Sequence, residues 1–206
     1  MVRTHTTTPR GRADGRPMHD APLAGLHRLV WTALMAALIA VGAMVMLPVG
    51  PVPVTLQTLF VALAGLVLGP ARGAGAMLLY VLAGVMGLPV FSGGKAGFAH
   101  LLGPTGGYLF GFASMACIAG FGGLRRRDAR DAAIRWPHVA LALCCCLAGL
   151  AVAYLAGAAR LMQVLDIDAA RAVAVGVLPF LPGDVVKVVL AVAAWRFLAV
   201  RRLLPR

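Results

Sequence analysis

The chain has 206 residues, of which 61% are hydrophobic and 13% charged, and its mean hydropathy is +0.88. Soluble domains have about 45–50% apolar and about 25% charged residues, so this composition excludes an ordinary soluble domain, a disordered chain and a coiled coil. An integral membrane protein remains. Because one membrane-spanning helix takes about 20 residues, six spans and short loops fill the chain and leave no room for a soluble catalytic domain.

The charge balance is strongly basic, with 19 Lys and Arg against 7 Asp and Glu and a net charge of +12. A basic excess can indicate nucleic-acid binding, but this chain has no soluble basic face to carry it. We therefore expect no nucleic-acid partner. Positive residues in the loops of a membrane protein set its orientation, and this explanation fits the chain better.

In chain order, residues 1–27 are polar and rich in Thr, Arg, Gly and Pro, which predicts a disordered, arginine-rich cytoplasmic tail. Residues 28–206 form the expected membrane domain. The predicted spans, separated by Pro- and Gly-rich links and by a charged loop at 125–135, are 29–47, 54–68, 74–88, 106–124, 137–159 and 183–200. The second and third are short for a span, so a re-entrant hairpin over 54–88 is an alternative.

Six spans place both termini and the links near 72 and 125–135 on one side of the membrane. That side then holds fifteen of the Lys and Arg residues and the other side three. Positive residues accumulate on the cytoplasmic side, so we expect both termini to be cytoplasmic. Trp31, Trp136 and Trp195 fall at the predicted cytoplasmic ends of spans, where an aromatic belt is expected.

Small residues recur every four positions in the first span, as Ala33 with Ala37 and Ala36 with Ala40. Such spacing makes a flat stripe on which a second helix can approach closely within a membrane. The stripe serves either packing inside the bundle or contact with a partner helix.

Asp184 and Lys187 lie in the segment PFLPGDVVK, three residues apart and therefore on one face of the last span. At about 1.5 Å per residue, both fall near the middle or the outer half of the bilayer. Ionisable groups at that depth are costly, and they face a cavity or one another. The pair is a candidate ligand site. The alternative is a purely structural ion pair, in which the negative charge of Asp184 is also favoured by the positive end of the helix dipole.

Two glycine-rich segments are further candidates. LLGPTGGYLFGF allows close backbone approach and carries Tyr108, which offers an aromatic face and a hydroxyl group. LPVFSGGKAGF predicts a flexible loop with Phe91, Gly94 and Lys95. Both map to the outer half of the membrane.

A fourth segment, GPVPVTLQTLF, places the polar side chains of Thr55 and Gln57 at the start of an apolar helix, again near the outer surface. Signatures of catalysis are missing from the sequence: it has no G-x-S-x-G elbow, no H-E-x-x-H pair and no P-loop. We therefore expect a non-enzymatic binding protein with no metal and no cofactor, open toward the outside of the cell.

Four segments of the chain, GPVPVTLQTLFVALAGLVLGPARG, LLYVLAGVMGLPVFSGGKAGF, LLGPTGGYLFGF and PFLPGDVVK, closely resemble the BioY family. These are the biotin-specific S components of energy-coupling-factor (ECF) vitamin transporters. The resemblance covers about residues 30–200. It implies a six-helix S-component bundle in the bacterial cytoplasmic membrane that captures biotin from outside. It also implies transport powered by a transmembrane coupling subunit and two ABC ATPases.

The resemblance also assigns roles to residues. It implies that Asp184 and Lys187 bind biotin, with Tyr108 and Phe91 as walls, and that the alanine stripe of the first span contacts the coupling subunit. In the loop at 92–95 some members have an amide side chain where this chain has Ser-Gly-Gly-Lys. The role of Lys95 and the end of biotin that Asp184 meets stay open. The alternatives are an S component for a different vitamin and a biotin transporter that works without the ATPase module.

Overall fold

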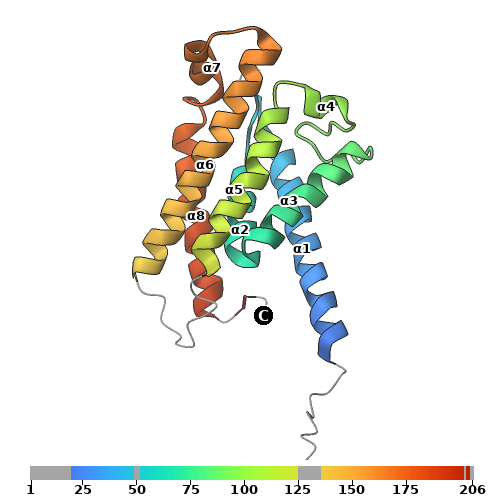
Figure 1. Ribbon diagram of the computed structural model, residues 1–206, viewed down its shortest axis with the longest axis vertical. Coiled ribbons are helices and arrows are strands. Elements are labelled where there is room, and N and C mark those ends of the chain that lie inside the picture. Colours follow the sequence, from blue (N-terminus) through green and yellow to red (C-terminus); the bar gives the residue numbers. More distant parts are fainter. Residues whose placement is uncertain (1–19, 49–51, 125–135, 202, 205–206) are drawn as a thin grey trace, which may run out of the picture.

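The structure, a computed structural model, describes residues 20–48, 52–124, 136–201 and 203–204 (Figure 1). This part of the chain is almost entirely helical, as predicted. Its elements are α1 (Asp20–Met44), β1 (Met46–Leu47), β2 (Val54–Thr55), α2 (Gln57–Leu68), α3 (Pro70–Val85), α4 (Ala99–Leu102), α5 (Gly106–Leu124), α6 (Trp136–Leu165), α7 (Ala169–Gly176) and α8 (Leu181–Val200).

The ends of the helices fall at two levels of the bundle. The short helices α4 and α7 lie at one end, and the start of α1, the start of α6 and the end of α8 lie at the other (Figure 1). Residues 1–19 of the predicted tail and the charged link at 125–135 lie outside the described residues. The first helix starts earlier than the predicted span and takes in residues 20–27.

The helices α5 and α6 pack against each other along their length because glycines leave room between their backbones. An added Cβ at Gly111 would lie 2.6 Å from Cα of Ala153, and one at Gly122 would lie 2.7 Å from Cα of Ala142. Real Cβ atoms do not approach backbone atoms that closely. These glycines of α5 therefore serve packing inside the bundle, as small residues at helix contacts do in membrane proteins.

The central helix is α2, whose side chains are buried from Val61 to Leu68 and which contacts α1, α3, α5 and α8. A sharp turn at Gly69, which has a φ of 84°, joins it to α3, and Pro70 starts the next helix. Glycine adopts this positive φ without strain, and proline is favoured in a first helical turn because its missing N–H would be unpaired there. The two short helices thus form a tight helical hairpin.

The prediction of six spans is confirmed only in part. By length and composition, three described helices can cross a membrane, with spans at Gly25–Met44, Gly106–Leu124 and Trp136–Leu165. A fourth is possible if α7 and α8, which meet at an angle of 54°, are taken as one broken span. The predicted spans 54–68 and 74–88 correspond to α2 and α3, which are shorter apolar helices.

One local prediction is corrected, and one is extended. The Pro-rich link after the first span carries no helix in its described residues, and β1 and β2 flank it as an antiparallel pair with Met46 opposite Thr55. Trp195 is completely buried in the bundle and cannot belong to an aromatic belt that faces lipid, since α8 turns this side chain inward. Trp136, by contrast, is 74% exposed.

Candidate functional site

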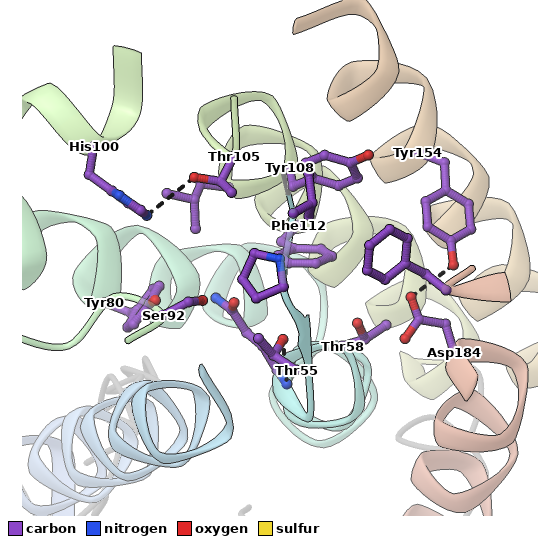
Figure 2. Close-up of a pocket in the computed structure, with 15 residues that line it drawn as sticks. Thr55, Thr58, Tyr80, Ser92, His100, Thr105, Tyr108, Phe112, Tyr154 and Asp184 are labelled. Carbon is purple, nitrogen blue, oxygen red and sulfur yellow. Dashed lines mark hydrogen bonds between the residues drawn. The ribbon is translucent and has the colours of Figure 1, made fainter. Parts of the chain in front are cut away.

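A cavity lies inside the bundle near the starts of α2, α5 and α8, and it is covered by the segment before α2 and by the loop between α3 and α5 (Figure 2). Its volume is about 50 Å3, room for a few water molecules, since one water needs roughly 10–15 Å3. The lining residues are Val52, Pro53, Thr55, Gln57, Thr58, Tyr80, Ser92, His100, Thr105, Tyr108, Leu109, Phe112, Tyr154, Phe180 and Asp184. The wall thus combines aromatic surface with a few polar groups, as small-ligand sites do.

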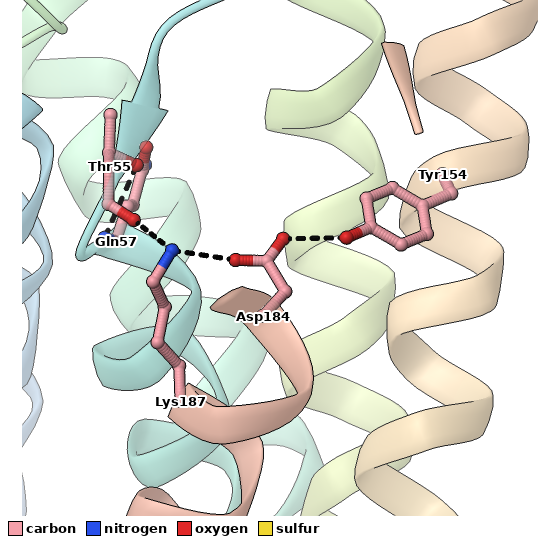
Figure 3. A network of polar contacts seen from close by, with 5 residues as sticks. All are labelled: Thr55, Gln57, Tyr154, Asp184 and Lys187. Atoms are coloured by element: carbon pink, nitrogen blue, oxygen red, sulfur yellow. Dashed lines mark hydrogen bonds and ion pairs between the residues drawn. The ribbon is translucent and has the colours of Figure 1, made fainter. Parts of the chain in front are cut away.

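One end of the cavity is formed by a chain of polar contacts centred on Asp184 (Figure 3). Lys187 Nζ lies 2.7 Å from Asp184 Oδ1 and donates a second hydrogen bond to the backbone oxygen of Thr55, at 2.6 Å. Tyr154 donates its hydroxyl hydrogen to Asp184 Oδ2 at 2.8 Å. Asp184 and Lys187 are 5% and 8% exposed. The buried carboxylate therefore has a cation on one oxygen and a neutral donor on the other.

The local sequence explains how Asp184 reaches this position. The helix α8 begins at Leu181 with Pro182 in its first turn, so Asp184 also falls in the first turn. There its negative charge is favoured by the positive end of the helix dipole. The spacing of three residues brings Lys187 onto the same face. The predicted shared face is confirmed, and the two side chains also pair with each other, which by itself does not decide between the ligand role and the structural alternative.

The other end of the cavity presents hydrogen-bond donors (Figure 2). Gln57 and Tyr80 are 3% and 2% exposed. Within the described residues neither Gln57 Nε2 nor the Tyr80 hydroxyl has a partner at full hydrogen-bond geometry, but the two side chains interact with each other. Burying polar groups without well-formed hydrogen bonds costs free energy, so a ligand that pairs with these two groups would be favoured. Close by, the Thr105 hydroxyl and Nε2 of His100 are 3.2 Å apart.

His100 belongs to the short helix α4 in the loop that covers the cavity. Burial, together with the positive charge of Lys95, lowers the pKa of His100 below its ordinary value of 6.5. The imidazole is therefore neutral at pH 7. A neutral ring can accept a hydrogen bond through one nitrogen and donate through the other, which suits an uncharged polar ligand.

Tyr108 contributes an aromatic wall. Its hydroxyl hydrogen is donated to the backbone oxygen of Gly176 in α7, at 2.6 Å, so it is not free for a ligand. Its ring fills the space beside Gly157 of α6, where a Cβ would collide with it. The predicted aromatic face is present, and the hydroxyl ties α5 to α7.

The predicted site residues divide into two groups. Thr55, Gln57, Tyr108 and Asp184 all line the cavity, although they come from distant parts of the chain. Lys187 is joined to them through its contacts with Asp184 and the Thr55 oxygen.

The three candidates from the glycine-rich loop lie elsewhere. Phe91 is fully buried beside the cavity, edge-on to Tyr80 with ring centroids 5.6 Å apart and stacked on His100 at 4.8 Å. Gly94 and Lys95 occupy an exposed turn in which Gly94 has a φ of 71°. The role of Gly94 and Lys95 in ligand binding stays a prediction.

Sequence reasoning missed several lining residues, of which Tyr154 and Tyr80 are the most informative. Both are tyrosines within apolar helices, and a buried tyrosine generally finds a partner for its hydroxyl. That general signal marks them as candidates. It could not have paired Tyr154 with Asp184, because the two are 30 residues apart in sequence.

The alanine stripe of α1 is split between two environments. Ala33 and Ala37 are exposed on the outside of the bundle, Ala40 is half-buried, and Ala36 is 7% exposed and packs in the core. The Ala33/Ala37 pair is thus the part of the stripe that a partner helix can reach.

Fold and cavity together define a helical membrane protein with an internal cavity that combines aromatic walls and polar groups, as small-ligand sites do. A family model described as the BioY family matches residues 14–206, so the match starts within the predicted tail and spans nearly the whole chain. The chain belongs to the BioY family. The resemblance noted in the sequence is thereby confirmed.

Individual relatives agree with this assignment. The chain is 42% identical over 160 residues to the "Probable biotin transporter BioY" of Pyrococcus horikoshii, and the aligned region covers 78% of this chain and 88% of that protein. It is 40% identical over 166 residues to the "Biotin transporter BioY" of Thermotoga maritima, covering 81% and 92%. Among solved structures it is similar to the S-component for biotin from an ECF-type ABC transporter, with a TM-score of 0.74 and 27% identity, covering 93% of this chain and 100% of that one.

Proposed function

We propose that this chain is a biotin-binding S component that captures biotin and carries it across the membrane. The observation that carries the proposal is the buried Asp184–Lys187 pair at the wall of a cavity, in a chain whose relatives are named biotin transporters. Those names, and the missing catalytic signatures, also support a protein that binds without chemical change. The similarity to the solved S-component structure supports the same conclusion.

The chemistry of the two ends of the cavity fits biotin. The ureido ring has two N–H donors and one carbonyl acceptor. Each oxygen of Asp184 accepts one hydrogen bond from the protein and has a second lone pair left, so this end can accept ligand N–H groups. Because Lys187 offsets the negative charge, an uncharged ring can bind there. Gln57 and Tyr80 supply donors for a ligand oxygen.

The cavity must widen to admit biotin, because its present volume of about 50 Å3 is that of a few waters. The two segments that cover it are short and largely free of regular structure, namely the residues around Pro53 and the glycine-rich turn at 92–97. Loop movements of this kind accompany ligand binding in many proteins. Lys187 holds the first segment to α8 through the Thr55 oxygen.

We further propose six membrane passes, with α2 and α3 as two short passes and both termini in the bacterial cytoplasm. The start of α1 and the end of α8 at one end of the bundle are consistent with an even number of passes (Figure 1). The excess of arginine on the side of the termini supports the orientation. Although α2 and α3 are short for membrane passes, α2 is enclosed by the helices α1, α3, α5 and α8 that it contacts, so its ends can be covered by protein.

A titration tests the substrate. We expect the detergent-purified protein to bind biotin near one per chain in a calorimetric experiment, and riboflavin and thiamine to give no heat. Binding of one of the control vitamins in place of biotin would move the proposal to that vitamin. No binding by a folded sample would reduce the family match to a shared fold.

Tyr154 is expected to contribute to affinity by orienting the carboxylate. Tyr154→Phe should weaken biotin binding by about tenfold or more, because a hydrogen bond to a charged group contributes roughly 1.5–3 kcal/mol and 1.4 kcal/mol is tenfold in affinity. Tyr108→Phe is the matched control, since the Tyr108 hydroxyl donates to the backbone oxygen of Gly176 and not to Asp184. It should lower the thermal midpoint and leave the affinity nearly unchanged. Equal losses in both variants would contradict the role given to Tyr154.

The proposed energy source is an ECF module of a transmembrane coupling subunit and two ABC ATPases, docked on Ala33 and Ala37. Ala37→Trp should abolish most module-dependent uptake and leave biotin affinity within about twofold, because exposed positions tolerate change. Leu155→Trp, on the exposed face of α6, is the control and should spare both. If Ala37→Trp loses biotin binding, this face belongs to internal packing. Uptake without any module would instead favour a transporter that works alone.

A further inference from the structure

A second hollow lies between α6 and α8, at the end of the bundle opposite the ligand cavity. It has a volume of about 460 Å3. The lining is apolar apart from one arginine and consists of Val139, Leu143, Val189, Val192, Ala193, Arg196, Phe197 and Val200. At about 1.5 Å per residue, Arg196 lies roughly 18 Å along α8 from Asp184. This groove, the α6–α8 groove, is therefore separate from the site described above.

Two arginines stand at the rim of the α6–α8 groove. The guanidinium carbon of Arg196 lies 4.8 Å from the centre of the Trp136 ring, and that of Arg201 lies 5.5 Å from the ring of Phe197. Within the described residues no carboxylate is within ion-pair distance of either guanidinium. The positive charge at this rim is thus held in place by aromatic rings and is not neutralised by a described acid.

The position along the helices is that of a membrane surface. Trp136 is the first residue of α6, and Arg196 lies one turn before the end of α8. Exposed tryptophan and arginine at the ends of apolar helices are typical of the level of lipid headgroups. An apolar groove that ends in cations at this level complements an anionic phospholipid, with its acyl chain in the groove and its phosphate at the arginines.

The groove opens toward the surroundings of the bundle, because Val189, Ala193 and Phe197 of its lining are exposed. Along α8 the lining extends from Val189 to Val200, about 16 Å. In a membrane protein such an outward, apolar groove contacts lipid, and its length suits an acyl chain that lies along α8.

We propose that the α6–α8 groove is a binding site for an anionic phospholipid, whose phosphate accepts hydrogen bonds from Arg196. The site is independent of the proposed substrate, since it shares no residue with the ligand cavity.

Competition between lipids tests this directly. The protein is placed in nanodiscs of equal amounts of phosphatidylglycerol and phosphatidylcholine, and the lipids that stay bound are counted by native mass spectrometry. We expect retention of phosphatidylglycerol over phosphatidylcholine by about fivefold or more, from the attraction of one arginine near the surface. Equal retention of the two lipids by the wild-type protein overturns the proposal without the use of any variant.

Variants then locate the site. Arg196→Gln should remove most of the preference, whereas Arg28→Gln, an equal loss of charge from an exposed position near the start of α1, should keep it. Ala193→Trp should fill the groove and reduce retention of both lipids. A preference lost equally in Arg196→Gln and Arg28→Gln would show general charge attraction only. If Ala193→Trp leaves lipid retention unchanged but blocks binding of a protein partner, the groove is a protein interface and the proposal is overturned. Biotin titration of the same samples separates this result from failure of the proposed function.

Discussion

Asp184→Asn is expected to weaken biotin binding by more than tenfold. The substitution keeps the size of the side chain but removes the negative charge that Lys187 and Tyr154 hold in place at 2.7 Å and 2.8 Å. One amide position becomes a donor, so the group can no longer accept hydrogen bonds on both sides. The buried ammonium of Lys187 also loses its counter-charge, and removal of one partner of a buried pair is costly. Calorimetric titration measures the loss.

Asp166→Asn is the matched control for this prediction. Asp166 is exposed and has a φ of 51°, a conformation that asparagine adopts as readily as aspartate. The chemical change is the same, but the position is outside the cavity, so the affinity should not change. If Asp184→Asn elutes as a folded protein with unchanged affinity, Asp184 has a structural role and the pair serves only to hold Thr55 to α8.

Gly111→Ala is expected to lower the stability of the bundle by about 1–3 kcal/mol, the usual cost of overpacking. Its Cβ would lie 2.6 Å from Cα of Ala153, which is backbone and cannot rotate away, so α5 and α6 must separate. For a chain of this size 1 kcal/mol corresponds to roughly 2–4 °C, which predicts a fall of roughly 2–12 °C. Thermal unfolding in detergent, followed by size-exclusion chromatography, measures it.

Gly75→Ala provides the comparison, because a Cβ added to this helical glycine meets nothing within 4 Å. Alanine is favoured over glycine within a helix by about 1 kcal/mol, so the midpoint should stay or rise. An equal fall in both variants would show that glycine is needed for helix flexibility in general and not for the contact of α5 with α6.

The polar residues of the site were accessible to sequence reasoning to different degrees. Asp184 and Lys187 stood out because charges within an apolar helix are costly and their spacing fixes a shared face. Thr55 and Gln57 stood out as polar residues at an apolar helix start. Tyr154 gave only the general signal of a buried tyrosine, since its partner is 30 residues away. Contacts at that separation depend on how helices pack.

Phe91 and Lys95 show the opposite case, in which the sequence suggested contacts with a ligand but the fold places both residues outside the lining of the cavity. A glycine-rich loop near the outer surface suggested that both could reach a ligand. In the fold Phe91 is buried between Tyr80 and His100, and the following turn carries Lys95 into solvent. Only the path of the loop decides which of its side chains point into the cavity, and Ser92 does so instead.

Membrane class, helical content and the family were determined by the sequence alone, because composition, span-length apolar segments and long motifs are properties of the chain itself. The face shared by Asp184 and Lys187 follows from helix geometry. The tertiary structure decided what these residues meet: Tyr154 and the Thr55 oxygen at one end of the cavity, Gln57 and Tyr80 at the other, and two arginines at the rim of a groove. It also placed Trp195 inside the bundle and Ala37 outside, since helix rotation is set by packing against neighbours and not by the residues of one helix.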